Sequence, residues 1–431
     1  MSIFKNLCEK RLLVVGYVWP EPKSSAAGTR MLQLLHTILQ AGYSITYASA
    51  AAKSIHRVTL ADIGIEELVI ALNDESFDAQ VEALAPQVVI FDRFFTEEQF
   101  GWRVAKVCPD ALQILDTEDL HSLRAARQRE LKRLVKIDSS VLSVSTDTLQ
   151  NADWMKDSNE AHREIASIMR VDITLMISPF EVDLLTQHFN VPAASLFYFP
   201  LLIEKNNPSQ QEMSPFHTRE HFISIGNFRH EPNWDAVLYL KEHIWPDIRK
   251  ALPQAQLHVY GAYPPPKATQ LHNAQQGFLV KGWAEDAFEV MSRARVLLAP
   301  LRFGAGVKGK LVDAFQTQIP SVTTTIGSEG LLNEDDNCWP GKIAAERADF
   351  IQAAITLYTD ESTWNAASHQ CEKLTANFTD FFTPDFISHL ETLHANLAEH
   401  RRNNFWGTML KQEMLQSAKY KGLWIEAKNR Q

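Results

Sequence analysis

The sequence predicts an α/β protein with two Rossmann-like domains, each built on a parallel sheet with helices on both faces. Three observations predict this class. Short apolar runs, typical of buried parallel strands, alternate with amphipathic helical stretches. A polar, proline-containing stretch at 204–215 interrupts the alternation, which then begins again. The chain has 431 residues, which is long enough for two domains that each have a sizeable core.

The first domain is expected over residues 1–205, with helices between its strands. A loop at 19–28 leads into the first helix, predicted at 29–40, and another helix follows Ser178-Pro179. The expected strands are 12–15, 45–48, 88–91, 112–115 and 172–177.

The second domain is expected over residues 216–382, after the linker. Its helices are predicted at 236–248 and 284–294. A third segment, 383–431, reads as amphipathic helix that packs back on the body. The expected strands of the second domain are 221–225, 256–260, 278–281, 295–299 and 321–325.

Composition excludes several classes. The formal net charge of −10 argues against a nucleic-acid partner. Cys8, Cys108, Cys338 and Cys371 form no Cys-x-x-Cys pair, which argues against a zinc ribbon or disulfide scaffold and favours a reducing cytoplasm. No apolar run reaches the length of a membrane span, and residues 1–11 lack the apolar stretch of a signal peptide.

The most informative segment follows the strand at 295–299. A turn containing Gly304 and Gly306 leads to Lys308, Lys310 and a helix that carries Asp313. Glycine lets backbone N–H groups approach an anion closely, and a helix start favours negative charge. The lysines suit a phosphate, and the aspartate suits sugar hydroxyls. The segment therefore predicts a site for a phosphate beside a polyol; the alternative is an ordinary strand-to-helix turn with solvated lysines.

Two better-known phosphate motifs are excluded. The turn lacks the Gly-Lys-Ser/Thr ending of a P-loop. Gly304, Gly306 and Gly309 have the spacing of the dinucleotide fingerprint, but that motif belongs to the first unit of a Rossmann domain with an acid on the next strand. Here the turn comes late in the chain, and threonines at 323–325 follow on the next strand.

The second half resembles the group 1 (family 4) glycosyltransferases of the GT-B fold. The matching segments, in chain order, are 224–228 with Asn233-Trp234-Asp235, Gly261, Gly282-Trp283, 294–300, Asp313-Ala314-Phe315, Pro320 with Val322 and Thr323, and 327–330. The first half matches more loosely, through Gly28 and the segment Asp116 to Arg124.

The resemblance implies that a sugar moves from a nucleoside-diphosphate sugar to a glycan, lipid or other acceptor, with retention and without metal or cofactor. The implied donor-binding residues are Gly28, Gly282, Trp283, Gly304, Gly306, Val307, Lys308 and Asp313. The implied catalytic residues are His121, Arg229 and Lys310, and the acceptor side would hold Asp119 and Arg124. Alternatives from the residues alone are a packed histidine at 121 and surface cations at 124 and 229.

One position departs from the family pattern. The family often carries two acids eight residues apart; here Asp313 takes the second position and Ala305 the first. We expect backbone amides at 304–307 to contact the donor sugar instead. Two alternative functions stay open, namely a GT-B sugar-nucleotide epimerase and a non-catalytic nucleotide-sugar-binding protein. Asp116-Thr117-Glu118 is the nearest approach to a metal-binding Asp-x-Asp, and we expect no metal there.

The C-terminal segment is basic. Residues 401–431 hold seven Lys and Arg against two Glu, beside Phe405, Trp406 and Trp424. One interpretation packs the aromatic side chains on the body. The other brings the helix to an anionic membrane surface, which would place a cytoplasmic enzyme at the inner face of a membrane.

Overall fold

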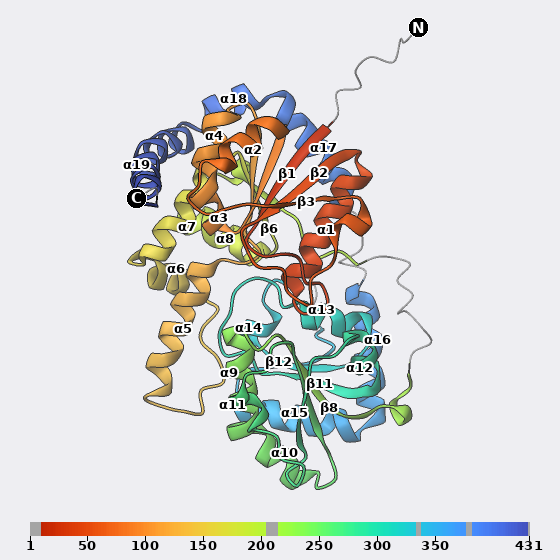
Figure 1. Cartoon of the computed structure of the whole chain (residues 1–431). Helices are drawn as coiled ribbons and strands as arrows, with labels where there is room; N and C mark the ends of the chain where they lie inside the picture. The colour runs from red at the N-terminus through yellow and green to blue at the C-terminus, as the bar shows by residue number, and fades with distance from the viewer. Residues whose placement is uncertain (1–9, 204–213, 333–337, 376–381, 430–431) are drawn as a thin grey trace.

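A computed structural model describes residues 10–203, 214–332, 338–375 and 382–429. The described residues form two parallel sheets, one above the other in Figure 1, with helices on both faces of each. The two Rossmann-like domains that the sequence predicts are thus present. Most of the predicted linker, residues 204–213, lies outside the described part of the chain.

The N-terminal domain contains a seven-stranded sheet in its described residues. All neighbouring strands are parallel. In spatial order they are β3 (Glu66–Val69), β2 (Tyr43–Ser49), β1 (Lys10–Gly16), β4 (Val88–Asp92), β5 (Leu112–Asp116), β6 (Ile173–Met176) and β7 (Leu196–Tyr198). The main helices are α1 (Ala26–Gln40), α2 (Ser76–Leu84), α3 (Phe94–Thr96), α4 (Trp102–Val107), α5 (His121–Val135), α6 (Thr148–Lys156), α7 (Asn159–Arg170) and α8 (Pro179–His188).

The C-terminal domain contains a six-stranded parallel sheet in its described residues. In spatial order its strands are β10 (Phe278–Gly282), β9 (Leu257–Tyr260), β8 (Glu220–Ile225), β11 (Ala294–Ala299), β12 (Ser321–Thr324) and β13 (Gly341–Ala344). Its helices are α9 (Glu231–Tyr239), α10 (Trp245–Ala251), α11 (Pro266–Thr269), α12 (Ala287–Arg293), α13 (Gly309–Gln316), α14 (Thr325–Ser328), α15 (Arg347–Thr359) and α16 (Glu361–Thr375).

The burial of the central strands explains why apolar runs in the sequence predicted them. Every residue of β4 and β5 is buried, because helices cover both faces of each sheet. The strands that the sequence did not predict are short and lie at or next to an edge. β3, for example, begins and ends with exposed residues, so it lacks the continuous apolar run of a central strand.

Three predicted helices have different bounds in the structure; the one predicted at 284–294 is the shorter α12, Ala287–Arg293. The first begins at Ala26 rather than at 29, because the Ser25 side chain caps it by accepting a hydrogen bond from the N–H of Gly28. The helix predicted at 236–248 begins at Glu231 and continues to Ala251, with a π-helical turn between α9 and α10.

The last helices return to the N-terminal domain. They are α17 (Phe382–Ala395), α18 (Leu397–Asn403) and α19 (Phe405–Asn429), coloured blue at the top of Figure 1. Phe386, Leu390 and Leu393 join the core that Leu12 and Ile38 form beneath the first sheet. No described helix combines the length and apolar character that crossing a membrane requires.

The segment that includes α5 packs against the other domain. Leu131 and Val144 share an apolar cluster with Leu301, Phe303 and Ile326 of the C-terminal domain. The N–H of Val144 also donates to the carbonyl of Arg302 at 2.9 Å. This packing fixes the glycine-rich turn against the first domain.

Candidate active site

The glycine-rich turn joins β11 to α13 at the boundary between the two domains. Gly306 has a left-handed φ of 63°, which favours glycine. A Cβ at this position would also lie 2.8 Å from the Cβ of Asp119 in the N-terminal domain. Gly306 is therefore required both by its backbone conformation and by close contact with the facing domain.

Lys310 lies in the first turn of α13. Its Nζ donates to the Asn233 side chain at 2.8 Å and packs on Gly226 at the end of β8. A side chain at Gly226 would meet both groups at less than 3 Å. Burial, with the nearby charge of Lys308, lowers the pKa of Lys310 to about 7.

Lys308 precedes α13 and carries the second cation of the turn. Its Nζ donates to the carbonyl of Gly306, and burial lowers its pKa. Within the described parts of the chain, neither Lys308 nor Lys310 makes an ion pair. Two desolvated ammonium groups beside a helix N-terminus, whose first N–H groups have no intrahelical partner, form a local anion site.

Asp313 lies one turn further along α13. Burial raises the pKa of its carboxyl to about 7, while Lys310 acts in the opposite direction. Near pH 7 this carboxyl can therefore be protonated or ionised. It can donate a hydrogen bond to a sugar hydroxyl in the first form and accept one in the second.

The loop after β5 brings the residues predicted for the acceptor side to the same boundary. Asp119 pairs with Arg124, and its second oxygen lies 3.4 Å from His121 Nε2. The imidazole ring packs edge-on against Phe94 and Phe95. Burial lowers the pKa of His121 to about 3, so the ring is neutral at pH 7 and suits hydrogen bonding better than charge neutralisation.

Glu181 connects the two domains directly. From α8, its Oε1 accepts from the N–H of Leu120 at 3.1 Å and from the N–H of Gly306 at 2.8 Å. The carboxyl is buried, and this burial raises its pKa to about 8. One carboxyl oxygen thus holds the glycine-rich turn against the loop that carries His121.

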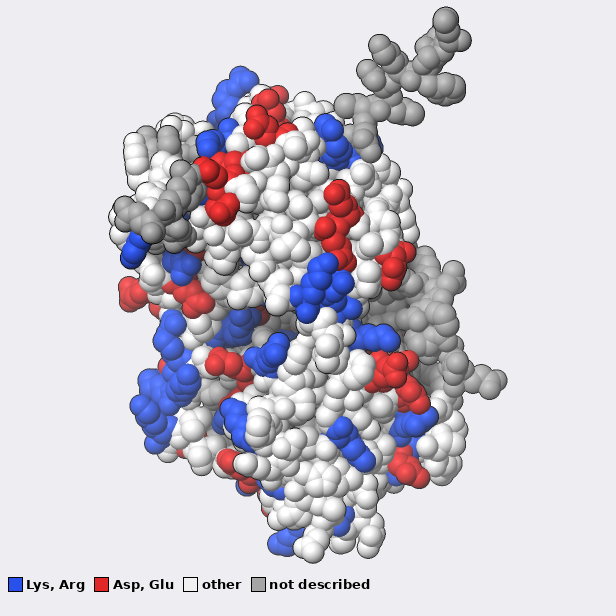
Figure 2. Space-filling view, in the orientation of Figure 1, with Lys and Arg blue, Asp and Glu red and all other residues white. Residues whose placement is uncertain are grey.

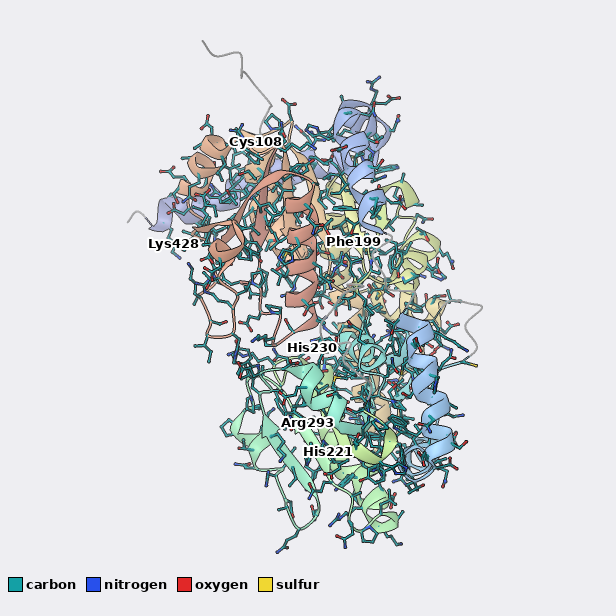
Figure 3. All side chains as sticks on the ribbon, turned by 90° about the vertical axis from the view of Figure 1, so that its right-hand side faces the viewer. Cys108, Phe199, His221, His230, Arg293 and Lys428 are labelled. Atoms are coloured by element: carbon teal, nitrogen blue, oxygen red, sulfur yellow. The ribbon has the colours of Figure 1, made fainter. Side chains whose placement is uncertain are left out.

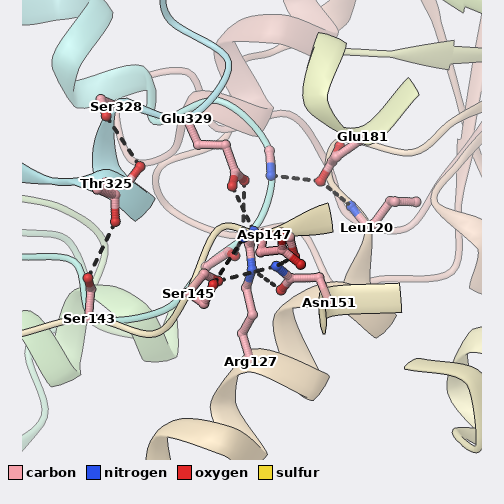
Figure 4. A network of polar contacts seen from close by, with 12 residues as sticks. Leu120, Arg127, Ser143, Ser145, Asp147, Asn151, Glu181, Thr325, Ser328 and Glu329 are labelled. Carbon is pink, nitrogen blue, oxygen red and sulfur yellow. Dashed lines mark hydrogen bonds and ion pairs between the residues drawn. The ribbon is translucent and has the colours of Figure 1, made fainter. Parts of the chain in front are cut away.

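Arg127 and Glu329 form a second connection, drawn in Figure 4. From α5, the guanidinium of Arg127 contacts both carboxylate oxygens of Glu329, at 2.8 and 2.7 Å. It also donates to the carbonyl of Gly304 and to Asn151, each at 2.8 Å. Because both charged groups are buried, this network fixes the position of the turn.

A separate set of contacts lies further along the boundary. The guanidinium of Arg229 stacks 3.6 Å above the ring of Tyr263, whose hydroxyl donates to Glu21 of the N-terminal domain. Trp283 donates from Nε1 to the carbonyl of Lys23 at 3.0 Å and packs on His56. Arg229 and Trp283 thus meet the first domain through its loop at 19–28.

The other two glycines predicted to face the donor have distinct surroundings. The N–H of Gly28 donates to the capping Ser25, and a Cβ there would lie 2.4 Å from the backbone of Glu21. Gly282, at the end of edge strand β10, has open space beside its Cα and a φ of 79°. The start of α1 nevertheless lies at the boundary, because a Cβ at Gly309 would lie 2.5 Å from that of Ala26.

The predicted residues therefore fall into two groups. Gly304, Gly306, Val307, Lys308, Lys310 and Asp313 surround the start of α13, facing Asp119, His121 and Arg124. Arg229, Gly282, Trp283 and Gly28 border the neighbouring contact of the 19–28 loop.

Figure 2 shows Lys and Arg side chains gathered along the boundary, and Figure 3 labels His230 at that level. In the described chain, no three His, Cys, Asp or Glu side chains are arranged to hold a metal ion.

Comparison with known proteins decides the class of this site. Residues 219–360, which contain the turn, Asn233 and α13, match the family model described as glycosyl transferases group 1. Residues 219–360 are a group 1 glycosyltransferase domain. This match confirms the family and the enzyme class that the sequence predicts. A comparison with the sequences of curated proteins gives no match.

Solved structures similar to the glycosyltransferase span both of its domains. Sucrose-phosphate synthase from Thermosynechococcus elongatus is 12% identical with a TM-score of 0.58, covering 92% of this chain and 99% of its own. HepE of Anabaena, in complex with UDP and glucose, is 12% identical with a TM-score of 0.60, covering 90% and 100%. WaaG, a glycosyltransferase of lipopolysaccharide biosynthesis, is 11% identical with a TM-score of 0.59, covering 88% and 99%. These likenesses confirm the predicted GT-B fold.

Sequence reasoning missed the residues that hold the two domains together. Glu329 lies in the segment 327–330, which resembles the family, and Glu181 lies in the helix predicted after Ser178-Pro179, but neither received a role. Arg127 follows His121 and Arg124 at successive intervals of three residues on one helix, and that spacing was the available signal.

Proposed function

We propose that the enzyme transfers a sugar from a nucleoside-diphosphate sugar, with the diphosphate bound at the start of α13. One observation carries this proposal: Lys308 and Lys310 make no ion pair within the described residues, although burial lowers the pKa of both. An anion at this point would relieve the desolvation of both groups. The UDP held by HepE, which has the same fold, supports a uridine nucleotide as the first donor to test.

The arrangement gives each group a part in the reaction. As the bond between the anomeric carbon and the diphosphate breaks, negative charge grows on the leaving phosphate. The α13 amides and the two lysines stabilise that charge in a largely dry site, which makes a metal ion unnecessary in this proposal. Asp313 hydrogen-bonds the ribose, and neutral His121 hydrogen-bonds a hydroxyl of the sugar or acceptor. The base side would be bordered by Gly282 and Trp283.

The stereochemical outcome in this proposal is retention, as in the family that the sequence resembles. The acceptor is a glycan or a lipid-linked molecule that enters from the side of Asp119 and Arg124. TarM, solved with UDP and α-GlcNAc-glycerol, and WaaG share the fold, which supports an acceptor of this kind. We also place the activity in the cytoplasm at the inner face of a membrane, because residues 401–431 are strongly basic.

Ala305 favours one second candidate, a protein that binds a nucleotide sugar without transferring it. The residue is buried in the core of the first domain, so no acid projects from this position toward the donor. The anion site at Lys308 and Lys310 and the buried network that positions it both argue against this candidate.

To test this proposal, the purified enzyme is incubated with a panel of nucleotide sugars in the presence of EDTA. Each nucleotide sugar is tried with and without glycan and lipid-linked acceptors. The proposal expects release of nucleoside diphosphate that depends on the acceptor and survives EDTA. Conversion of a nucleotide sugar without acceptor would indicate an epimerase. Binding without turnover on any acceptor would indicate the non-catalytic alternative, and loss of turnover in EDTA would contradict metal independence.

A further inference from the structure

Helix α19 exposes a stripe of large apolar side chains. The stripe consists of Phe405, Trp406, Met409, Tyr420, Leu423 and Trp424, which are 40–69% exposed. Since successive residues of an α-helix are about 100° apart, all six fall within an arc of about 100° on one face. The interpretation that packs these aromatic side chains on the body is therefore wrong, because the helix turns them outward.

The opposite face of α19 is anchored to the N-terminal domain. At Gly407 the helix approaches α7 so closely that a Cβ would lie 2.1 Å from the carbonyl oxygen of Met169. Just before the helix, Arg401 contacts both carboxylate oxygens of Asp172 at 2.7 Å. These contacts fix the rotation of the helix, so the outward direction of the stripe is a property of the fold.

A cavity of about 170 Å³ lies between the start of α19 and helices α4 and α7. Three cations line it. Arg170 is paired with Glu97 and Arg401 with Asp172. Lys411 makes no hydrogen bond or ion pair within the described chain, and burial lowers its pKa. The Asp172 carboxylate also lines the cavity, and Lys411 lies on the face of α19 opposite the stripe, so the cavity faces the body of the protein and the stripe faces away from it.

We propose that α19 docks on an anionic membrane surface, with its aromatic stripe in the interface. This inference rests on the membrane location in the proposed function and names the surface that makes the contact. Trp, Tyr and Phe together with Lys are the side chains that suit a bilayer interface. Charge complementarity supports the choice, because residues 401–431 hold seven Lys and Arg against two Glu in a chain of net charge −10.

A second copy of the chain is the other candidate occupant. A two-fold contact through the stripe would bring two basic helices together, and their like charges would oppose it. The helix also lies on the outer side of the N-terminal domain, as Figure 1 and the label on Lys428 in Figure 3 show.

The test is co-sedimentation of the full-length protein with phosphatidylcholine vesicles, with and without phosphatidylglycerol. We compare wild type with the triple variant Phe405→Ser, Trp406→Ser, Trp424→Ser. Ile137→Ser, which removes an exposed apolar side chain at the end of α5, is the matched control. Wild type and control should bind only vesicles that contain phosphatidylglycerol. The triple variant should bind at least about tenfold more weakly, because it lacks three of the six apolar side chains of the stripe.

Three results would overturn the inference: equal binding of wild type to both vesicles, unchanged binding of the triple variant, or a wild-type dimer in solution that the triple variant converts to monomer without vesicle binding. Thermal unfolding and binding of nucleoside diphosphate, measured on the same proteins without vesicles, show that each variant is folded. They also separate failure of membrane docking from failure of the proposed transfer activity.

Discussion

Arg127 and Glu329 join the two domains through a buried, two-pronged ion pair, with N–O distances of 2.8 and 2.7 Å. The same guanidinium holds the carbonyl of Gly304, in the turn that precedes α13. Glu181 holds the next glycine of that turn, Gly306, from α8. The proposed phosphate site is therefore positioned by the N-terminal domain even though its charged groups belong to the C-terminal one.

The first prediction concerns this ion pair. Arg127→Ala leaves the Glu329 carboxylate buried without its partner, which should lower the free energy of unfolding by about 3–5 kcal/mol. Denaturant unfolding measures the change. Arg293→Ala breaks an exposed pair with Glu289 and, as the matched control, should cost less than about 1 kcal/mol. Equal losses in the two variants would show that the buried pair does not hold the domains together.

The second prediction concerns turnover. Lys310→Ala removes a cation from the proposed leaving-group site and should lower kcat by about 10²- to 10³-fold, because the growing charge loses one stabilising group. The exposed Lys342→Ala is the control and should leave kcat unchanged. Both variants should keep the wild-type melting temperature within a few degrees. A Lys310→Ala enzyme with wild-type kcat would remove this residue from the mechanism.

The third prediction concerns protons taken up on binding. Burial holds the pKa of Lys310 at about 7, so near pH 7 a large fraction of this side chain is neutral. A bound diphosphate favours the charged form, so binding should take up protons and weaken as pH rises above 7. Calorimetry in two buffers of different ionisation enthalpy measures the uptake. Lys310→Arg, whose side chain stays charged, should reduce that uptake; the same uptake in this variant would assign it to another group.

The fourth prediction concerns acid stability. Burial holds the pKa of His121 at about 3 in the folded enzyme, against 6.5 for an ordinary histidine. Between these values the unfolded chain binds more protons, so the contribution of His121 to stability is present above pH 6.5 and is lost as pH falls toward 3. His121→Asn should therefore flatten the decline of melting temperature over this window. The exposed His369→Asn is the control, and an identical decline in both variants would contradict a buried neutral imidazole at 121.

The central strands and the anion site could be predicted because their signals are local. β4 and β5 are continuous apolar runs, and Lys308, Lys310 and Asp313 stand within six residues of one another. The network around the turn could not be predicted in the same way. Arg127 and Glu329 are 202 positions apart, and Glu181 and Gly306 are 125 apart, so only the fold brings them together.

Gly28 shows that one local sequence signal can have two structural explanations. A glycine in the first turn of a helix suits close approach of a phosphate, which is the role that the family resemblance implies. In the structure, the backbone of Glu21 occupies the space where a side chain would lie. The sequence pattern alone does not separate packing against a loop from approach of a ligand.

The most direct test of the proposed donor site is calorimetric titration of wild type and a Lys308→Ala, Lys310→Ala double variant with a panel of nucleoside diphosphates. We expect wild type to bind at least one of them, and the double variant to bind it about 100-fold more weakly with an unchanged melting temperature, because both cations that face the diphosphate are gone. Equal affinity in the two proteins would contradict a donor diphosphate at the start of α13.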